Sequence, residues 1–501
     1  MANDYDVIIV GAGLGGLTTA SLLTQRGQNV LIVDKHKLPG GYATNFQRGD
    51  FTFDASLHSF DGMIPGAYSY KVIEAAGIAD KVEFIPHERL YTIKTLNHGE
   101  IVVNYQDLDG YILTLIQLFP EEKKAIRKLF AEMVKMYKDV GGFVFSRLPF
   151  LARLAATPVL YHKILRYERS TVKDFFLQYT HNEELIKILS AQWTYYGLPP
   201  ERLAFGYFGY PTIDYLMNGG FCVKGGSQIL SDALVSVIEK HGGTVKLSAP
   251  VRKIIVDKGR AIGVTIKGLG DIYGKKIIAN ANPYIISDLI GDSCPIKLNK
   301  NLSKSRPSNS GFQIYLGLDC ELDQFGVAKE DSNKFIEGTG SLKEQFRLMM
   351  QSKVESNKTG YCLTYFSNAD QTLAPAGKST LGLFSLVGSK GWFDITKTEY
   401  REKKKNLTAA LLEKAELELP GLGKHIEICE TATPRTMRNF TGNYQGSIYG
   451  FEQSVHQNGL FNRFPQKYPI KDLYQVGSWT FPGGGYIGTM LSAQLLVGRY
   501  F

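Results

Sequence analysis

The feature that most constrains this chain is an apolar segment near its start that runs directly into three spaced glycines. Val7 to Val10 reads as a short buried strand, and Gly11, Gly13 and Gly16 follow it in the spacing G-x-G-x-x-G. In that spacing the glycines allow a tight turn, a close approach of the backbone to a pyrophosphate, and close packing of a helix on a strand. The helix that follows, expected to stop at Gly27, presents free amides to phosphate groups. The segment therefore predicts the first half of a dinucleotide site.

A second strand and an acidic residue complete this unit. Val30 to Val33 is again apolar and ends at Asp34, about 20 residues beyond the glycines, where a carboxylate can accept hydrogen bonds from ribose hydroxyls. The chain has 52 glycines among 501 residues, so chance repeats of the spacing are expected. One lies at 483–488, where too few residues remain before Phe501 for a second strand and acid. The N-terminal copy alone has the full context that nucleotide binding requires.

The length and composition indicate a globular protein of two or three lobes. A chain of 501 residues exceeds one ordinary core, and its hydrophobic fraction of 44% and charged fraction of 21% are typical of globular proteins. Five scattered cysteines without a C-x-x-C pair argue for a reducing compartment, and the histidines show no metal-ligand spacing. We therefore expect no metal site. No signal peptide precedes the first strand, which predicts a cytoplasmic protein.

The net charge of +9 leaves several partners open. The dispersed lysines come without a helix-turn-helix, finger or RNA-binding signature, so we expect no nucleic acid partner. A basic protein suits the anionic inner face of a membrane, although solubility alone would explain the charge. Residues 142–167 interleave apolar side chains with Arg147, Arg153, Lys163 and Arg166, as a helix lying peripherally on a membrane would. The alternative for this segment is an ordinary pair of buried helices.

Periodicity divides the remaining chain into helical and mixed regions. Residues 105–205 are expected to be mostly helical, and Val251 to Val256 is expected to pair with Ala261 to Ile266 across a tight turn. Residues 310–435 mix strands with a helix, and the chain then returns to a glycine-rich turn and a last helix at 486–497. Segments far apart in sequence thus share the nucleotide-binding character, which predicts an α/β fold with interleaved domains.

Several motifs together resemble one known family. They are the N-terminal fingerprint, the pair Gly40-Gly41, the segments FTFDASLHSFDG, KGGSQ, HGGTV, PVRKI and NANP, and the terminal VGSWTFPGGGYIG. This set resembles the phytoene desaturase, carotenoid isomerase and retinol saturase group of FAD-dependent oxidoreductases. The resemblance covers about the first 60 residues, residues 220–285 and the last 70. It implies a Rossmann-like FAD-binding domain, of the glutathione-reductase or amine-oxidase type, interleaved with a mixed α+β substrate domain and a helical, membrane-associating region.

On this resemblance we assign domains and cofactor contacts. The FAD-binding domain comprises 1–75, 219–295 and 441–501; residues 76–218 form a mostly helical region facing substrate or membrane, and 296–440 form the substrate domain. The residues that the resemblance assigns to FAD are Gly11, Gly13, Leu14, Gly15, Gly16, Asp34, Lys35, Gly40, Gly41, Tyr42, Val251, Gly477, Gly485, Ile487 and Gly488. Two of them depart from the family pattern. Asp34 stands where many relatives have glutamate, and Tyr42 stands where an arginine often follows the glycine pair.

The resemblance implies redox chemistry on a hydrophobic polyene or isoprenoid such as a carotenoid or retinoid. Flavin performs the hydride or electron chemistry, while the protein orients the substrate and excludes water. Desaturation sends a hydride to flavin N5 and a proton from the neighbouring carbon, and saturation is the reverse. One alternative is a flavin-dependent cis-trans isomerase. An alternative of another class is a non-catalytic prenyl-lipid escort protein, which the intact glycine pair disfavours. No second fingerprint supplies a pyridine nucleotide site, and the electron acceptor is unspecified.

Four polar side chains are candidates for contact with substrate or flavin. The resemblance places His58 near the flavin, so it is the first catalytic candidate, with a histidine hydrogen-bonded within the fold as the alternative. Lys224 could lie over the flavin, Arg435 could hold a polar end group, and Tyr449 could line the substrate wall. Asp54 is expected to cap a turn rather than to take part in chemistry.

Overall fold

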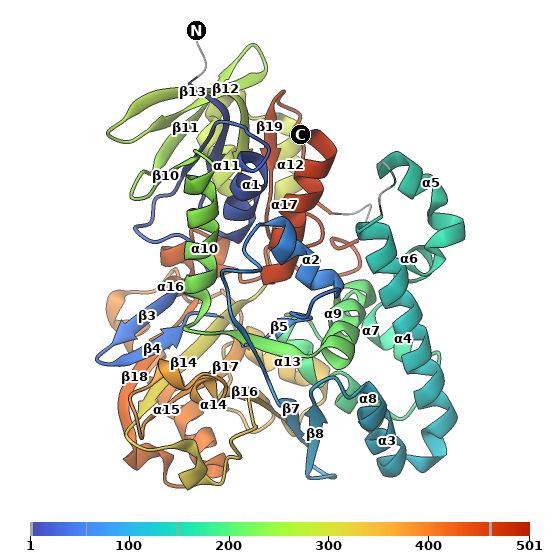
Figure 1. Cartoon of the computed structure of the whole chain (residues 1–501). Helices are drawn as coiled ribbons and strands as arrows, with labels where there is room; N and C mark the ends of the chain where they lie inside the picture. Colours follow the sequence, from blue (N-terminus) through green and yellow to red (C-terminus); the bar gives the residue numbers. More distant parts are fainter. Residues whose placement is uncertain (1–3, 57, 147, 149, 460–462) are drawn as a thin grey trace.

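The computed structural model describes residues 4–56, 58–146, 148, 150–459 and 463–501. Two large sheets dominate it, one at the top of Figure 1 and one at the bottom, with helices at the right of the view. The upper sheet has the strand order β10-β2-β1-β13-β12-β11, and β19 also pairs with β13. Its strands are β1 (Tyr5–Val10), β2 (Val30–Val33), β10 (Thr244–Lys246), β11 (Val251–Asp257), β12 (Arg260–Ile266), β13 (Gly270–Ala279) and β19 (Leu473–Gln475).

The central strand β1 is buried on both faces, which explains its continuous apolar sequence. Val7 and Ile9 pack on one side with α1 (Leu14–Thr24), α10 (Ser227–Lys240) and α17 (Tyr486–Tyr500). Ile8 and Val10 face the other side, where α11 (Pro283–Ile290) and α12 (Ile296–Lys304) contribute to a separate core. Strands β2 and β13 pair in parallel with β1, and β10 pairs in parallel with β2, as is typical of strands covered by helices on both faces. The expected hairpin is present, with Val256 opposite Ala261.

The lower sheet belongs to the second domain and has the order β18-β14-β17-β16-β15-β7-β8. Its strands are β7 (Arg89–Lys94), β8 (Glu100–Asn104), β14 (Ser310–Leu318), β15 (Asn333–Ile336), β16 (Tyr361–Thr364), β17 (Ser379–Val387) and β18 (Ile426–Ala432). The helices α13 (Leu342–Met350), α14 (Phe366–Ala369), α15 (Lys397–Glu418) and α16 (Pro434–Thr441) accompany it. Residues 76–218 are therefore less uniformly helical than expected, because β7 pairs in parallel with β15 and carries β8 into this sheet.

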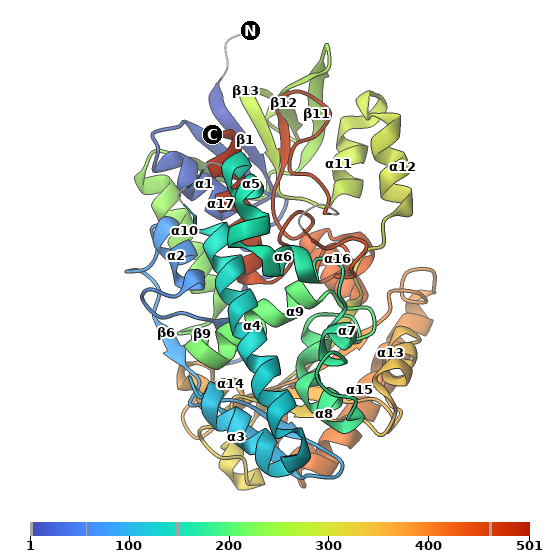
Figure 2. The same ribbon diagram turned by 90° about the vertical axis from the view of Figure 1, so that its right-hand side faces the viewer.

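The helical region begins at Leu108 and packs along one side of both sheets (Figure 2). It contains α3 (Leu108–Leu118), α4 (Lys123–Val144), α5 (Phe150–Leu160), α6 (His162–Tyr167), α7 (Val172–Phe176), α8 (Glu183–Leu189) and α9 (Phe205–Asn218). One apolar stripe of α4 is buried, including Leu129 and Met133. Among the described residues no helix is long and apolar enough to cross a membrane.

Two small sheets connect the domains. One pairs β3 (Asn45–Arg48) with β4 (Phe51–Asp54), and the other has the order β5-β9-β6, formed by β5 (Phe60–Asp61), β9 (Gly220–Val223) and β6 (Phe84–Pro86). Helix α2 (Tyr68–Ala75) follows β5 directly. Asp54 ends β4 and His58 shortly precedes β5, so these short elements help to position both residues.

Candidate active site

Asn280 lies at the centre of the glycine cradle. It follows β13, and its Nδ2 donates a hydrogen bond to the Gly11 carbonyl at 3.3 Å. A Cβ added to Gly11 would lie 2.4 Å from the Asn280 carbonyl oxygen, and one added to Gly15 would lie 2.8 Å from its Oδ1 and 2.9 Å from Gly477 Cα. A Cβ on Gly16 would lie 2.1 Å from the Gly11 carbonyl. The N-terminal and C-terminal segments therefore meet around one asparagine, in a space that side chains would fill.

Asp34 sits at the polar end of this cradle. Its Oδ2 accepts a hydrogen bond from the Ala12 amide at 2.7 Å, and its Oδ1 accepts one from the His36 amide at 2.7 Å. Both oxygens retain lone pairs for ribose hydroxyls. Helix α1 begins next to it at the N-cap Gly13, where no side chain caps the helix. The first amides of α1 are thus available to an anion, as in dinucleotide sites.

The glycine pair Gly40-Gly41 lies next to Gly13 of the N-terminal fingerprint. Gly40 forms a parallel bridge with Gly13 and has φ +116°, and Gly41 has φ +66°. The next residue, Tyr42, donates from its hydroxyl to the Ser447 carbonyl at 3.1 Å, and burial raises the pKa of Tyr42 to about 12. The residue that replaces the family's arginine is therefore an uncharged phenol anchored to the C-terminal segment.

One continuous cavity of about 1460 Å³ joins these parts. Its wall includes the residues expected to bind FAD at Gly11, Gly13, Leu14, Gly15, Asp34, Lys35, Gly40, Gly41, Tyr42, Val251, Gly485, Ile487 and Gly488. Gly16 and Gly477 are not part of this wall. Because they have no side chain, Gly16 can lie close to the Gly11 carbonyl and Gly477 close to Asn280. The volume exceeds the 300–1,000 Å³ or so of a typical single-ligand pocket. The cavity can therefore hold an extended dinucleotide together with a second molecule.

A second uncapped helix N-terminus borders the same cavity. Helix α17 begins after Gly485, which has φ +84° and provides no side-chain cap, and Tyr486 and Ile487 line the cavity. Helix α10 differs, because Asp54 Oδ2 accepts from the Ser227 amide at 2.7 Å and so satisfies its first turn. Asp54 thus has the capping role expected from the sequence. The positive end of α17 remains available to a ligand that carries partial negative charge.

The far part of the cavity is lined mainly by aromatic side chains. They are Tyr195, Tyr196, Tyr207, Tyr210, Tyr215, Phe384 and Tyr449. Burial raises the pKa of Tyr449 well above its usual range, and likewise that of Tyr195. These phenols are therefore uncharged, and they give this part of the cavity rings and hydroxyl groups.

His58 lines this aromatic part as a neutral imidazole. Its Nδ1 lies 2.5 Å from Thr364 Oγ1, which in turn donates to Asn333 Oδ1 at 3.0 Å. Because the threonine has one hydrogen and gives it to Asn333, the Nδ1 of His58 must be the donor. Burial lowers the pKa of His58 to about 4. The structure thus shows a histidine that is both hydrogen-bonded in the fold and exposed to the cavity.

The other three candidates lie in different places. Tyr449 is on the cavity wall, as expected. Lys224 instead forms a surface ion pair with Glu83, with Nζ to Oε2 at 2.9 Å. Arg435 donates to the carbonyls of residues 393 and 395 and lies over the Tyr400 ring. Neither cation is part of the cavity wall, so the geometry does not support a substrate contact at Lys224 or Arg435. Each charge is satisfied locally, which a sequence cannot reveal.

Helices α4 and α6 close the cavity on the outer side. Met136, Val140 and Phe143 of α4 and Ile164 of α6 belong to its wall. Of the expected basic flank, Lys163 is paired with Glu132, and Arg153 donates to the Phe143 and Val144 carbonyls. Arg147 lies outside the described residues. Among the residues of 142–167 that the structure describes, some belong to a buried helix pair and others are exposed, and Arg166 is an exposed cation near Glu132.

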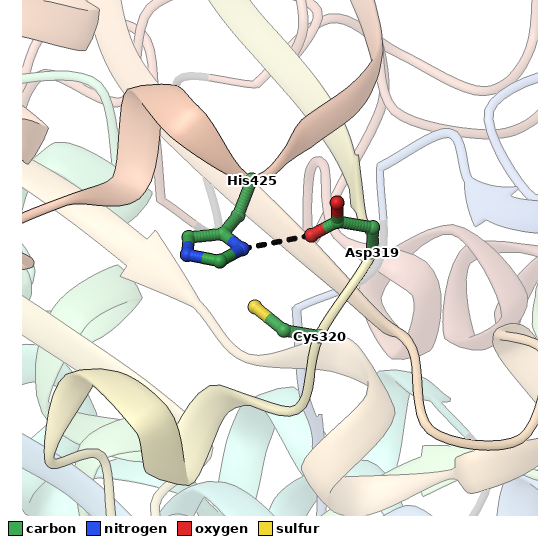
Figure 3. Close-up of side chains that lie close together, drawn as sticks. All are labelled: Asp319, Cys320 and His425. Atoms are coloured by element: carbon green, nitrogen blue, oxygen red, sulfur yellow. Dashed lines mark hydrogen bonds and ion pairs between the residues drawn. The ribbon is translucent and has the colours of Figure 1, made fainter.

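A separate cluster lies at the surface of the substrate domain. Asp319, Cys320 and His425 place one ligand atom each within 4.8 Å of one another, and His425 Nδ1 lies 2.8 Å from Asp319 Oδ1 (Figure 3). The expectation of no metal site overlooks this grouping, because His425 is far from Asp319 in sequence. The imidazole–carboxylate hydrogen bond already accounts for the proximity, so we assign no site to it.

The fold and the glycine cradle are those of a dinucleotide-binding protein, with a cavity large enough for a second molecule. The family model described as flavin containing amine oxidoreductase matches residues 14–496, and the chain belongs to that family. It is therefore a flavin enzyme, and its cofactor is FAD. The glycine cradle, Asp34 and the two uncapped helix ends fit that cofactor. The expected family resemblance, the enzyme class and the cofactor are thus confirmed.

Curated relatives match along nearly the whole chain. All-trans-retinol 13,14-reductase of Danio rerio is 27% identical and covers 95% of this chain and 82% of its own. Chloroplastic prolycopene isomerase of Daucus carota is 25% identical, covering 99% and 80%. A 4,4'-diapophytoene desaturase of Methylomonas sp is 26% identical, covering 99% and 96%. Among solved structures, an oxidoreductase from Methanosarcina mazei has a TM-score of 0.66 at 16% identity, covering 98% and 99%. The structural match shows the amine-oxidase-like fold alone.

Proposed function

We propose that this protein is an FAD-dependent oxidoreductase that acts on carbon–carbon bonds of a hydrophobic polyene or isoprenoid, as a desaturase or saturase. The observation that carries this proposal is one cavity that joins a nucleotide cradle to a wall rich in aromatic side chains, among them Tyr195, Phe384 and Tyr449. A conjugated hydrocarbon suits such a wall, because rings give it contact area and stabilise positive charge that develops on it. The three curated relatives act on retinoid or carotenoid polyenes according to their names.

The chain's own residues bind and orient rather than react. When bound, FAD supplies the hydride chemistry between its N5 and a substrate carbon. The uncapped N-terminus of α17 at Gly485 would stabilise negative charge on a reduced flavin ring. His58, neutral and held by Thr364, would orient the substrate beside it. Lys35 and the backbone of Val251 would hold the adenosine end.

The mass of the product distinguishes desaturation or saturation from cis-trans isomerisation. Purified protein would be incubated with a retinoid, a carotenoid and a linear isoprenoid, with the flavin reduced in one series and oxidised in the other. Loss or gain of a pair of hydrogens supports a desaturase or saturase. An unchanged mass with a changed absorption spectrum supports the cis-trans isomerase, which the carrot relative's name also favours. No reaction with any polyene would refute the proposal.

A lipid-binding protein without catalysis is the alternative of another class. A Rab GDI from Plasmodium falciparum shares the fold at a TM-score of 0.54 and 12% identity. The intact cradle around Asn280 favours retained flavin instead. A purified protein that is yellow and releases FAD supports the enzyme. A colourless protein that FAD does not reconstitute would support the lipid-binding alternative.

We further propose that α5 and α6 contact a membrane, so that substrate enters from it. Leu160 is 55% exposed and Val159 is 78% exposed, while Ile164 of the adjacent α6 lines the cavity. Leu160→Asp should lower co-sedimentation with anionic phospholipid vesicles several-fold. Leu269→Asp is a matched control, because Leu269 is 51% exposed in the turn before β13. Equal binding by wild type and both variants would contradict membrane contact through these helices.

A further inference from the structure

Two aspartates from distant parts of the chain share one hydroxyl beside the substrate cavity. Asp61, at the end of β5, lines the cavity, and Asp214 of α9 lies fully buried behind it. Ser69 Oγ lies 3.1 Å from Asp61 Oδ2 and 2.6 Å from Asp214 Oδ2. Gly62 permits this approach, because a Cβ there would lie 2.8 Å from Asp214 Oδ2. The four elements β5, α2, α4 and α9 thus hold the pair in place.

The hydrogen count favours a protonated carboxyl in this pair. Ser69 has one hydroxyl hydrogen, and two carboxylates can only accept. Asp214 also accepts from Tyr137 at 2.9 Å and from Asn218 at 2.5 Å, so it is satisfied as the anion. Ser69 then donates its hydrogen to Asp214, at the shorter distance. The Ser69 oxygen can in turn accept a hydrogen bond from a protonated Asp61. The arrangement is satisfied when Asp61 is the acid.

The surroundings agree with this assignment. Burial, and then the Asp214 charge, hold the pKa of Asp61 well above its usual range. The other titratable groups that act on the pair are the phenols of Tyr137, Tyr196, Tyr210 and Tyr215. Burial raises the pKa of each of them, so they carry no charge at neutral pH. The acid therefore keeps its proton while it faces an apolar cavity.

Asp61 also lies close to the flavin end of that cavity. Its neighbour Phe60 packs edge-on against Tyr486, the first residue of α17, with ring centroids 5.4 Å apart. The Tyr215 hydroxyl donates to the Ser59 carbonyl at 2.9 Å, which ties α9 to the same strand. Asp61 and the N-terminus of α17 at Gly485 therefore line one cavity.

We propose that Asp61 is the proton donor of this enzyme, with Asp214 and Ser69 as positioning residues. This rests on the proposed function. The O–H bond of Asp61 breaks and a C–H bond forms on one carbon of a double bond, which leaves Asp61 ionised. In saturation the neighbouring carbon receives a hydride from reduced flavin, so the double bond is reduced and the flavin oxidised. In isomerisation the same proton returns to Asp61. A resting acid suits these two reactions, since desaturation needs a group that accepts a proton.

The protonation state can be tested without turnover. Infrared difference spectra of the holoenzyme, wild type minus Asp61→Asn, should contain the C=O stretch of a protonated carboxylic acid, shifted in D₂O. Asp319→Asn, the same change at a surface site away from the cavity, should leave that band in place. Asparagine keeps the shape of Asp61 and can still donate to Ser69, so folding is preserved. If the band is absent from wild type, or persists in Asp61→Asn, Asp61 is not the acid.

The role is tested by turnover of a retinoid or carotenoid with reduced flavin. Asp61→Asn should retain substrate binding but lose about 10²–10⁴-fold in kcat, the usual range for a general acid. Asp61→Glu should recover part of it, and product formed in D₂O should carry solvent deuterium. Wild-type kcat in Asp61→Asn would overturn the proposal. If the wild type turns over no polyene, the proposed function fails, and the role of Asp61 in that reaction fails with it. The infrared band of the wild type reports the protonation of Asp61 independently of turnover, so the two failures can be told apart.

Discussion

Gly15→Ala should separate the two chain segments that build the cofactor site. An alanine Cβ would lie 2.9 Å from Gly477 Cα and 2.8 Å from Asn280 Oδ1. Ordinary carbon contacts are about 3.5–4.0 Å, so α1 and the C-terminal turn must move apart by roughly 0.6–1 Å. Such overpacking costs about 1–3 kcal/mol. If that cost falls on the bound state, FAD affinity drops by roughly 5- to 150-fold.

The assay is the FAD content of purified protein together with titration of the apoprotein. Gly498→Ala is the matched control, because it lies in α17 and a Cβ there meets nothing within 4 Å. That change should leave FAD binding unaltered and stabilise the fold by about 0.4–1 kcal/mol. Wild-type FAD content and affinity in Gly15→Ala would refute the close approach of these backbones.

Four further changes test separate parts of the structure. Asp54→Ala should destabilise by about 2 kcal/mol in urea unfolding, because it removes the α10 cap and leaves Ser227 without its buried acceptor; an unchanged midpoint would contradict the capping role. Asn280→Leu should yield protein depleted in FAD, since the donor to the Gly11 carbonyl is lost; full FAD content would show that the glycines alone suffice. Burial lowers the pKa of His87 to about 4, so the unfolded chain binds more protons than the folded chain between pH 4 and 6.5. Stability therefore falls as pH drops through that window. His87→Gln should reduce the dependence of the unfolding free energy on pH there by up to about 1.4 kcal/mol per pH unit. The raised pKa of Asp61 acts with the opposite sign, because the folded state then binds more protons and stability falls as pH rises above the ordinary range of a carboxyl. The stability of Asp61→Asn, measured relative to wild type, should therefore be higher at neutral pH than at pH 4.

The nucleotide site was predictable because its signals are local. The strand Val7 to Val10, the glycines and Asp34 lie within one short stretch, and steric rules fix what glycine does there. The role of Asn280 was not predictable, because it depends on β13 pairing with β1 and on the return of Gly477. The NANP segment marked the position without indicating its function.

The substrate side was harder to predict because its residues are brought together only by the fold. Asp61 and Asp214 are linked through Ser69 across three separate elements, and sequence gave no signal beyond an aspartate after Phe60. Lys224 and Arg435 were misleading for the same reason, since their partners lie far away in the chain. Residues 89–104 pair with the substrate sheet, which local periodicity alone does not predict.

The central claim is that one cavity brings a flavin and a polyene together for reaction. The most direct measurement mixes the purified holoenzyme with a polyene anaerobically and follows the flavin spectrum and the product mass together. We predict that the flavin changes its redox state while the polyene gains or loses a pair of hydrogens, or that the polyene isomerises with its mass unchanged. The account would be contradicted if the flavin is present but its spectrum does not change and every retinoid and carotenoid tested is recovered unaltered.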